Sequence, residues 1–305
     1  MTKRVLVTGA RGFIGSRCLA PLMEAGFEVH GTTSRQEVPT ADNGVLWHQL
    51  DLLDPRSVAA LVSQIEPSHL LHLAWITEHG VYWHSPVNES WLNSSKLLLA
   101  TFAEQGGHRA VVAGTCAEYD WMTGACQEYK TPLKGASLYR RSKIALAEYL
   151  THLGNQTGLK TAWGRVFFAF GEGEPATRLI PKVIRQLDAG EPAKCSEGLH
   201  KRDFIYVEDV AGAFVKLLLS EAVGPVNIGS GRATSIRDLV TMLARLMGRE
   251  RLLEIGASPT AQPEPPLVVA DVTRLHKEVE FSPYYSLEMG LDATIQSLTN
   301  TNFRV

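Results

Sequence analysis

The chain has 305 residues, which allows one large α/β domain or one such domain with a smaller companion. Hydrophobic residues make up 45% and charged residues 20%, as in ordinary globular proteins. The formal net charge is −2 and basic residues form no run, so neither a nucleic-acid partner nor a membrane surface is expected.

Short apolar runs alternate with helical patterns along the first half of the chain. We predict strands at residues 4–7, 27–32, 45–50, 69–74, 109–115 and 161–167. Helices are predicted at residues 13–25, 87–104 and 137–155, and another begins at Asp54-Pro55, a good N-cap followed by a good first helical residue. This alternation is typical of a parallel sheet with helices on both faces.

The alternation loosens after Phe168. Helices are predicted at residues 177–189, 207–220, 235–247 and 286–298, with short extended pieces at 202–206 and 226–228. The predicted fold class is α/β, with a Rossmann-type doubly wound parallel sheet and a smaller C-terminal α/β domain. We assign residues 1–167 and 207–234 to the sheet domain and residues 168–206 and 235–305 to the smaller one, so the chain crosses between them more than once.

A glycine-rich turn joins the first predicted strand to the first helix. Gly9, Gly12 and Gly15 lie three residues apart in the segment TGARGFIG. The first glycine permits a tight turn, the second lets the backbone approach a pyrophosphate, and the third lets helix pack on strand. The free N–H groups of the helix N-terminus then favour a phosphate-bearing cofactor.

This turn resembles the cofactor loop of the extended short-chain dehydrogenase/reductase superfamily, which includes NAD(P)-dependent nucleotide-sugar epimerases, dehydratases and reductases. The resemblance extends from Val5 to about Leu291. It implies that the sheet domain binds the cofactor and the smaller domain binds a nucleotide sugar. It also implies that Asp51 accepts a hydrogen bond from the adenine amino group. Further cofactor contacts are implied at Phe13, Ile14, Leu52, Leu73 and Ala74.

The end of the second predicted strand indicates which cofactor is used. A carboxylate at this place would bind the ribose hydroxyls of NAD, but the segment here has no acid. It carries the hydroxyl side chains of Thr33 and Ser34, followed by Arg35, and Arg11 of the glycine turn should project to the same place. Guanidinium groups bind phosphate oxygens through paired donors, so we predict NADP(H).

Tyr139 and Lys143 form a Tyr-x-x-x-Lys pair on one face of a predicted helix. A nearby ammonium group is expected to lower the phenol pKa from its ordinary value of about 10. Thr115 ends the fifth predicted strand, and the resemblance implies that it completes a catalytic triad with these two residues. Tyr139 would exchange a proton with the substrate, and Lys143 would also hold the nicotinamide ribose.

The residues after Thr115 restrict the reaction. Dehydratases of the superfamily carry Thr-Asp-Glu at this strand end, whereas this chain carries Thr115-Cys116-Ala117. The two carboxylates are absent and Glu118 is one position off, so dehydration is not expected. A small buried side chain is the favoured interpretation of Cys116, which would lie beside the substrate.

The resemblance implies two substrate-binding arginines, Arg202 near the diphosphate and Arg178 at the start of a helix over the nucleotide. Phe168 occupies the place of a substrate-binding asparagine, so contacts there must differ. Aromatic residues after the fourth predicted strand, Trp75, Tyr82 and Trp83, could stack on a sugar or simply pack within their loop.

The leading hypothesis is NADPH-dependent reduction, at C4, of a nucleotide-linked 4-keto-6-deoxy sugar in deoxysugar or polysaccharide biosynthesis. The nicotinamide would supply the hydride and Tyr139 the proton. The alternatives are an NAD(P)-dependent nucleotide-sugar epimerase and a non-catalytic NADP-sensing protein. The nucleotide and the sugar stay open, and the resemblance implies a homodimer.

Cysteine content and hydropathy suggest the cellular setting. The four cysteines match no metal-binding spacing and are too few for a disulfide framework, so we expect free thiols and no metal. No apolar run approaches the ~18 residues of a membrane span, and no signal-peptide pattern is present. A cytoplasmic protein is therefore expected.

Overall fold

Apolar side chains alternate between the two faces of the first strands, and this alternation organises the fold. The computed structural model describes residues 3–35, 44–78, 80–259 and 265–300. Seven parallel strands form the central sheet in the order β11-β7-β5-β4-β1-β2-β3. Their bounds are β1 Lys3–Thr8, β2 Phe27–Thr33, β3 Leu46–Gln49, β4 His69–His72, β5 Arg109–Thr115, β7 Lys160–Val166 and β11 Gly224–Ile228. The predicted parallel sheet is confirmed, and the strand order reverses between β1 and β4, where ligands bind in such folds.

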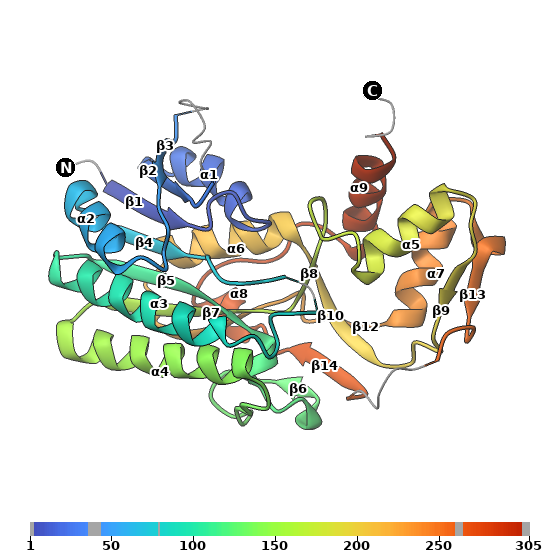
Figure 1. The fold of residues 1–305 in the computed structure, drawn as a ribbon. Coiled ribbons are helices and arrows are strands. Elements are labelled where there is room, and N and C mark those ends of the chain that lie inside the picture. The colour runs from blue at the N-terminus through green and yellow to red at the C-terminus, as the bar shows by residue number, and fades with distance from the viewer. Residues whose placement is uncertain (1–2, 36–43, 79, 260–264, 301–305) are drawn as a thin grey trace.

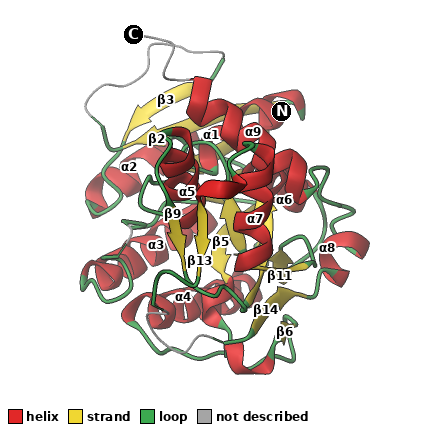
Figure 2. Ribbon diagram, turned by 90° about the vertical axis from the view of Figure 1, so that its right-hand side faces the viewer, coloured by secondary structure: helices red, strands yellow, loops and turns green. Residues whose placement is uncertain are grey.

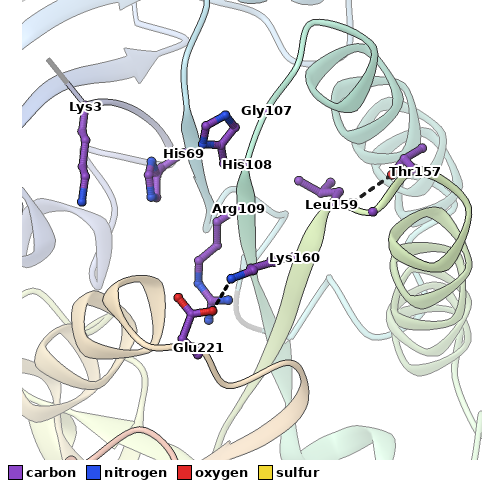
Figure 3. A pocket seen from close by; sticks show the side chains of 10 residues that line it. Lys3, His69, Gly107, His108, Arg109, Thr157, Leu159, Lys160 and Glu221 are labelled. Atoms are coloured by element: carbon purple, nitrogen blue, oxygen red, sulfur yellow. Dashed lines mark hydrogen bonds and ion pairs between the residues drawn. The ribbon is translucent and has the colours of Figure 1, made fainter. Parts of the chain in front are cut away.

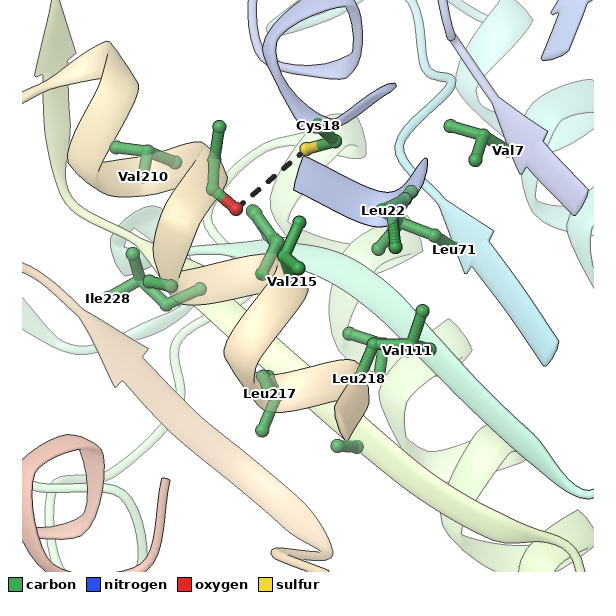
Figure 4. Packing of buried hydrophobic residues seen from close by; sticks show 14 of the residues in the cluster. Val7, Cys18, Leu22, Leu71, Val111, Val210, Val215, Leu217, Leu218 and Ile228 are labelled. Carbon is green, nitrogen blue, oxygen red and sulfur yellow. Dashed lines mark hydrogen bonds between the residues drawn. The ribbon is translucent and has the colours of Figure 1, made fainter. Parts of the chain in front are cut away.

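Helices cover both faces of this sheet (Figure 1). Helices α2 (Pro55–Ile65), α3 (Val87–Glu104) and α4 (Leu138–Thr157) pack on one face, where Leu6 of β1 is buried. Helices α1 (Gly15–Glu24) and α6 (Val207–Leu219) pack on the other, with Val5 and Val7. Figure 4 shows Cys18 and Leu22 of α1 meeting Val215 of α6. A doubly wound sheet thus follows from the period of two in its strands.

A second group of elements lies beyond the carboxyl ends of the central strands (Figures 1 and 2). Its larger sheet has the order β12-β10-β14-β6, with β8 also paired to β10, and β9 pairs with β13. The strand bounds are β6 Ala125–Cys126, β8 Phe168–Phe170, β9 Ala193–Cys195, β10 Lys201–Tyr206, β12 Ala233–Ser235, β13 Leu253–Ile255 and β14 Leu267–Ala270. Helices α5 (Leu179–Asp188), α7 (Ile236–Leu246) and α9 (Leu287–Asn300) share one apolar core here.

The chain passes between the two groups repeatedly. Strand β6 comes from the first half of the sequence but joins the second sheet, whereas α8 (Thr273–Lys277) returns to contact β11 of the central sheet. The division into two domains stays a prediction. The longer predicted helices and strands agree with the observed bounds to within about two residues, and α3 and β5 agree at both ends. The strands of two to four residues in the second group were not predicted, because they are too short to show a period.

Candidate active site

The glycine turn after β1 is closed by backbone contacts that leave no room for side chains. Gly9 has a positive φ of +70°, and a Cβ atom there would lie 2.8 Å from the backbone nitrogen of Ala74. A Cβ atom on Gly15 would lie 2.1 Å from the carbonyl oxygen of Gly9, which also accepts a hydrogen bond from the Gly12 N–H at 2.8 Å. Only glycine fits these positions, and the turn is held against Leu73 and Ala74 after β4.

The first turn of α1 opens beside this contact. Its N-cap residue, Ile14, provides no side-chain hydrogen bond to the helix. Within this turn the N–H groups of Ser16 and Arg17 donate to the carbonyls of Gly12 and Ile14, each at 3.1 Å. The close-fitting glycines at the positive end of the helix still fit the pyrophosphate of a dinucleotide. Phe13 and Ile14 are half-buried and pack against the apolar core of the second group.

The ends of β2 and β3 lie side by side, because the Leu50 N–H donates to the Thr33 carbonyl at 2.8 Å. Ser34, Arg35 and Arg11 are exposed, and the Thr33 hydroxyl accepts a hydrogen bond from the Arg35 N–H at 3.1 Å. No acidic residue lies among residues 29–35.

Asp51 and Leu52 follow β3 with opposite exposure. The Asp51 side chain is exposed, and one of its oxygens accepts the Leu53 N–H at 2.9 Å. Leu52 is buried, and its carbonyl accepts a hydrogen bond from Ser94 of α3. Asp51 is therefore placed to present its other oxygen at the carboxyl edge of the sheet.

The structure brings Thr115, Tyr139 and Lys143 together. Thr115 ends β5, and a hydrogen bond joins its hydroxyl to that of Tyr139 near the start of α4. Lys143 lies one turn further along α4, and its Nζ donates to the carbonyl of Ala113 in β5 at 2.9 Å. The contact between α4 and the end of β5 therefore assembles the three predicted side chains.

Burial dominates the electrostatics of this group. Lys143 is 4% exposed, and burial lowers its pKa to about 7 although the charge of Glu118 opposes the shift. Its Nζ lies 3.9 Å from the ring centroid of Trp75. Burial also raises the pKa of Tyr139, reinforced by Tyr82 and offset by the hydrogen bond from Thr115. In the protein alone, the expected lowering of the Tyr139 pKa is wrong, because burial outweighs an ammonium that is itself destabilised.

The aromatic residues after β4 pack around the same group. The ring centroids of Tyr82 and Trp83 lie 4.8 and 5.6 Å from that of Tyr139, both edge to face. The Trp83 carbonyl accepts the Tyr139 N–H at 3.2 Å. These residues and Trp75 therefore position the triad.

Sequence reasoning missed Arg140. Its guanidinium carbon lies 4.7 Å from the ring centroid of Trp121 and 5.5 Å from that of Trp83. Stacking on two indoles holds a cation next to Tyr139. The sequence feature that could have identified Arg140 as a site residue is its position directly after Tyr139.

Glu118 is part of a buried network and not of the reacting surface. It is 0% exposed, and its carboxylate accepts the Thr115 N–H at 2.8 Å and the Arg165 Nε–H at 2.7 Å. The Trp163 indole also donates to it at 3.0 Å. The carboxylate is thus engaged in holding the end of β5 to β7. Cys116 is buried as predicted, and burial raises the pKa of its thiol.

The predicted substrate arginines differ in exposure. The Arg178 side chain is 40% exposed and its Nε lies 2.9 Å from a carboxylate oxygen of Glu174. Arg202 is 3% exposed, and its Nη1 donates to the carbonyls of Lys201 and Pro265 at 2.9 and 2.8 Å. Its guanidinium carbon lies 5.7 Å from the ring centroid of Phe168, the residue at the position of the expected asparagine.

The described residues include neither a metal-binding cluster nor a membrane-spanning helix. Among them, no group of three or more His, Cys, Asp or Glu residues is arranged to hold a metal ion. No helix within the described part of the chain has the length and hydropathy needed to span a membrane.

Comparisons with known proteins agree on the family and the type of fold. The family model described as the NAD dependent epimerase/dehydratase family matches residues 5–229. UDP-glucuronic acid decarboxylase 1 of Xenopus tropicalis is 26% identical over 306 residues, covering 96% of this chain and 71% of that protein. GDP-6-deoxy-D-mannose reductase of Pseudomonas aeruginosa is 27% identical over 314 residues, covering 97% of each.

A solved structure is similar over nearly the whole chain. The UDP-glucose 4-epimerase of Thermus thermophilus, in complex with NAD, has a TM-score of 0.82 at 25% identity, covering 97% of this chain and 98% of that one. The observed α/β architecture is therefore that of a Rossmann-fold epimerase.

Proposed function

Because the chain belongs to the NAD-dependent epimerase/dehydratase family, we propose that it is an NADPH-dependent reductase of a nucleotide-linked 4-keto-6-deoxy sugar. Members of this family are NAD(P)-dependent enzymes, and the relatives found include a reductase, an epimerase and a decarboxylase. The proposed reaction takes place at C4 of the sugar, where the keto group becomes a hydroxyl.

The observation that carries this proposal is the hydrogen bond between the hydroxyls of Tyr139 and Thr115 at the end of β5. Burial raises the pKa of Tyr139, so the side chain holds its proton at neutral pH, the form that a reduction requires. The Thr115 hydroxyl donates to the keto oxygen and places it within reach of Tyr139. The carboxylate of Glu118, three residues after Thr115, is engaged by Arg165 and Trp163, which disfavours loss of water.

The residues around the glycine turn would hold the cofactor. A reduced nicotinamide supplies the hydride equivalent when bound. Gly9, Gly12 and Gly15 leave space for the pyrophosphate, and the Asp51 carboxylate accepts a hydrogen bond from the adenine amino group. Lys143, close to the end of β5, binds the nicotinamide ribose.

NADP(H) is proposed over NAD(H) on the side chains after β2. Thr33, Ser34, Arg35 and Arg11 surround the position of a ribose 2′-phosphate and include no carboxylate that would repel it.

Arg178, proposed to lie over the nucleotide, is the more accessible of the two proposed substrate-binding arginines, because its side chain is partly exposed. Arg202 directs donors to backbone carbonyls, so its role is to shape the wall beside Phe168 and to add positive charge. We also propose that the enzyme acts as a homodimer.

Nucleotide-sugar epimerisation is the second candidate, favoured by the similarity to an epimerase that binds NAD. The two candidates differ in cofactor use. A reductase consumes NADPH in each turnover, whereas an epimerase regenerates its NAD.

The deciding assay mixes the protein and NADPH with dTDP-, GDP- or CDP-linked 4-keto-6-deoxy sugars and follows the loss of the reduced nicotinamide absorbance. We expect stoichiometric oxidation with at least one sugar. No oxidation with any of them, together with tightly bound NAD in the purified protein, would exclude the reductase.

Tyr139→Phe tests the proton donor. We expect kcat to fall by about 10²–10⁴-fold, as for the loss of a general acid, with NADPH binding retained. Tyr149→Phe on the same helix is the matched control and should keep wild-type turnover. Full activity of Tyr139→Phe would show that another group donates the proton.

A further inference from the structure

A cavity lies at the edge of the central sheet opposite the candidate active site. It has a volume of about 430 Å³ and lies where β1, β4, β5 and β7 begin (Figure 3). Arg109 at the start of β5 lines it, and Thr115 ends the same strand, roughly 20 Å away at ~3.3 Å per residue. The cavity is therefore separate from the candidate active site.

The lining of this cavity is positively charged. Lys3, Arg109 and Lys160 line the cavity together with one carboxylate, that of Glu221, so these four side chains carry a net charge of +2. The ring of His69 responds to this field. Its pKa is lowered to about 4, first by burial and then by repulsion from Lys3, His108 and Arg109.

Arg109 has more donors than the protein uses. It is 4% exposed, and its Nη2 donates to the carbonyls of Leu217 and Ala222 at 2.6 and 2.7 Å, which caps the end of α6. Its Nε and Nη1 are buried and have no hydrogen-bond partner among the described residues. A guanidinium has five N–H donors, so helix capping leaves three unused. Buried unpaired donors of this kind are destabilising unless a ligand or water satisfies them.

The side chains beside the guanidinium are exposed to solvent. Lys160 and Glu221 form an ion pair beside Arg109, with side chains that are 54% and 81% exposed (Figure 3). Exposed pairs contribute only ~0–1 kcal/mol, so an anion can displace Glu221 at little cost. The place that Glu221 leaves then lies between one buried and two exposed cations.

We propose that this cavity binds a phosphate group, with Arg109 as its buried ligand and Lys160 and Lys3 at its mouth. A phosphate dianion matches the net charge of the lining, and arginine and lysine together are common phosphate ligands. The cavity is far larger than the ~30 Å³ of one water, so it has room for a larger group. That group is either free inorganic phosphate or the phosphoryl end of a nucleotide. The site is independent of the proposed reductase activity.

Histidine ring signals offer a local test, since His69 and His108 line the cavity. The ¹⁵N-labelled protein is titrated with inorganic phosphate, and separately with UMP, at constant ionic strength against potassium chloride. Ring signals are assigned with His69→Gln and His108→Gln. We expect saturable shifts of both rings with phosphate or UMP and none with chloride. The ligand that saturates at lower concentration identifies the source of the phosphate group.

Variants separate this cavity from the cofactor turn. Lys160→Ala should raise the dissociation constant about tenfold, and Glu221→Gln should lower it severalfold by removing the competing carboxylate. Arg11→Ala, at the glycine turn, is the control and should leave it unchanged. Absent or non-saturating shifts, or binding lost in Arg11→Ala but kept in Lys160→Ala, would overturn the proposal.

Discussion

At the scale of single residues, burial sets protonation more strongly than neighbouring charge does. Lys143 lies beneath Tyr139 and against Trp75, and its pKa of about 7 makes it a mixture of charged and neutral forms near neutrality. Tyr139, by contrast, keeps its proton. In the protein alone, Tyr139 is therefore in the form that can donate a proton. The charge of a bound cofactor would shift the pKa values of both Tyr139 and Lys143.

The proposed preference for NADP(H) over NAD(H) also depends on individual side chains. The double variant Arg11→Ala/Arg35→Ala should raise KM for NADPH by at least about 100-fold, because it removes two charged hydrogen bonds of ~1.5–3 kcal/mol each. KM for NADH should change little, since NADH lacks the 2′-phosphate. Initial rates with both cofactors measure the ratio, and Arg56→Ala on α2 is a surface control. Equal effects on both cofactors would contradict the NADP assignment.

Glu174 links pH to stability. One carboxylate oxygen pairs with Arg178 and the other, Oε2, is buried without a partner among the described residues. Burial raises its pKa from 4.5 to about 7, although Arg178 opposes the shift. The native state therefore binds more protons than the unfolded state between these pH values, and stability falls as pH rises through them.

Glu174→Gln should remove this pH dependence. From about pH 4.5 to 7, the free energy of unfolding of the wild type should drop by roughly 3 kcal/mol relative to the variant, at ~1.36 kcal/mol per pKa unit. Urea unfolding at several pH values measures the difference. Glu172→Gln, an exposed neighbour, should follow the wild-type curve. Parallel curves for wild type and Glu174→Gln would show that Glu174 ionises normally.

At the scale of elements, the active site depends on two junctions. The glycine turn joins β1 to α1, and the contact between α4 and the end of β5 assembles Thr115, Tyr139 and Lys143. Each junction combines a local sequence pattern with one long-range contact. In the first, the turn rests on Ala74; in the second, Lys143 bonds to Ala113.

Gly15→Ala tests the first junction. The added Cβ would clash with the Gly9 carbonyl, so the turn must open and both stability and cofactor affinity should fall, the affinity by at least about tenfold. Gly26→Ala is the control, because it has a positive φ but nothing within 4 Å of the added atom. It should cost about 1 kcal/mol of stability and leave cofactor affinity intact. Fluorescence titration and thermal unfolding separate the two effects.

At the scale of the whole molecule, buried polar groups tie the second sheet together and connect it to the central one. The carboxylate of Asp203 on β10 is 0% exposed and accepts hydrogen bonds from the N–H groups of Ser230, Gly231 and Ala270 at 2.7–3.0 Å. Ser230 and Gly231 follow β11 of the central sheet, so one side chain holds segments from both groups.

Asp203→Ala should therefore lower the free energy of unfolding by roughly 3 kcal/mol or more, because it removes the acceptor of three backbone N–H groups, among them the buried N–H of Ala270. Asp292→Ala, on the exposed side of α9, should change it by less than about 0.5 kcal/mol. Urea unfolding of both variants measures the difference. A loss for Asp203→Ala no larger than that of the control would show that the two groups are held together by apolar packing.

The homodimer is also a prediction at this scale. Sedimentation equilibrium should give twice the 33.5 kDa of one chain. A mass of one chain at micromolar concentration would contradict it.

Much of the fold and the site could be predicted from the sequence because the signals are local. Helical patterns and short apolar runs are visible along the chain, so α3 and β5 were predicted with their observed bounds. Tyr139 and Lys143 share a helix face by their spacing alone, and the glycines mark their own turn.

The remaining features were decided by tertiary structure. The Glu118 carboxylate accepts hydrogen bonds from Trp163 and Arg165, more than forty residues further along the chain, and only the register of β5 against β7 brings them together. Arg140 is held by indoles from two different loops, and Arg109 is buried where four strands begin. The surroundings of Glu118, Tyr139 and Arg109 distinguish their proposed roles, which their residue types alone do not. These surroundings depend on how elements distant in the sequence pack together.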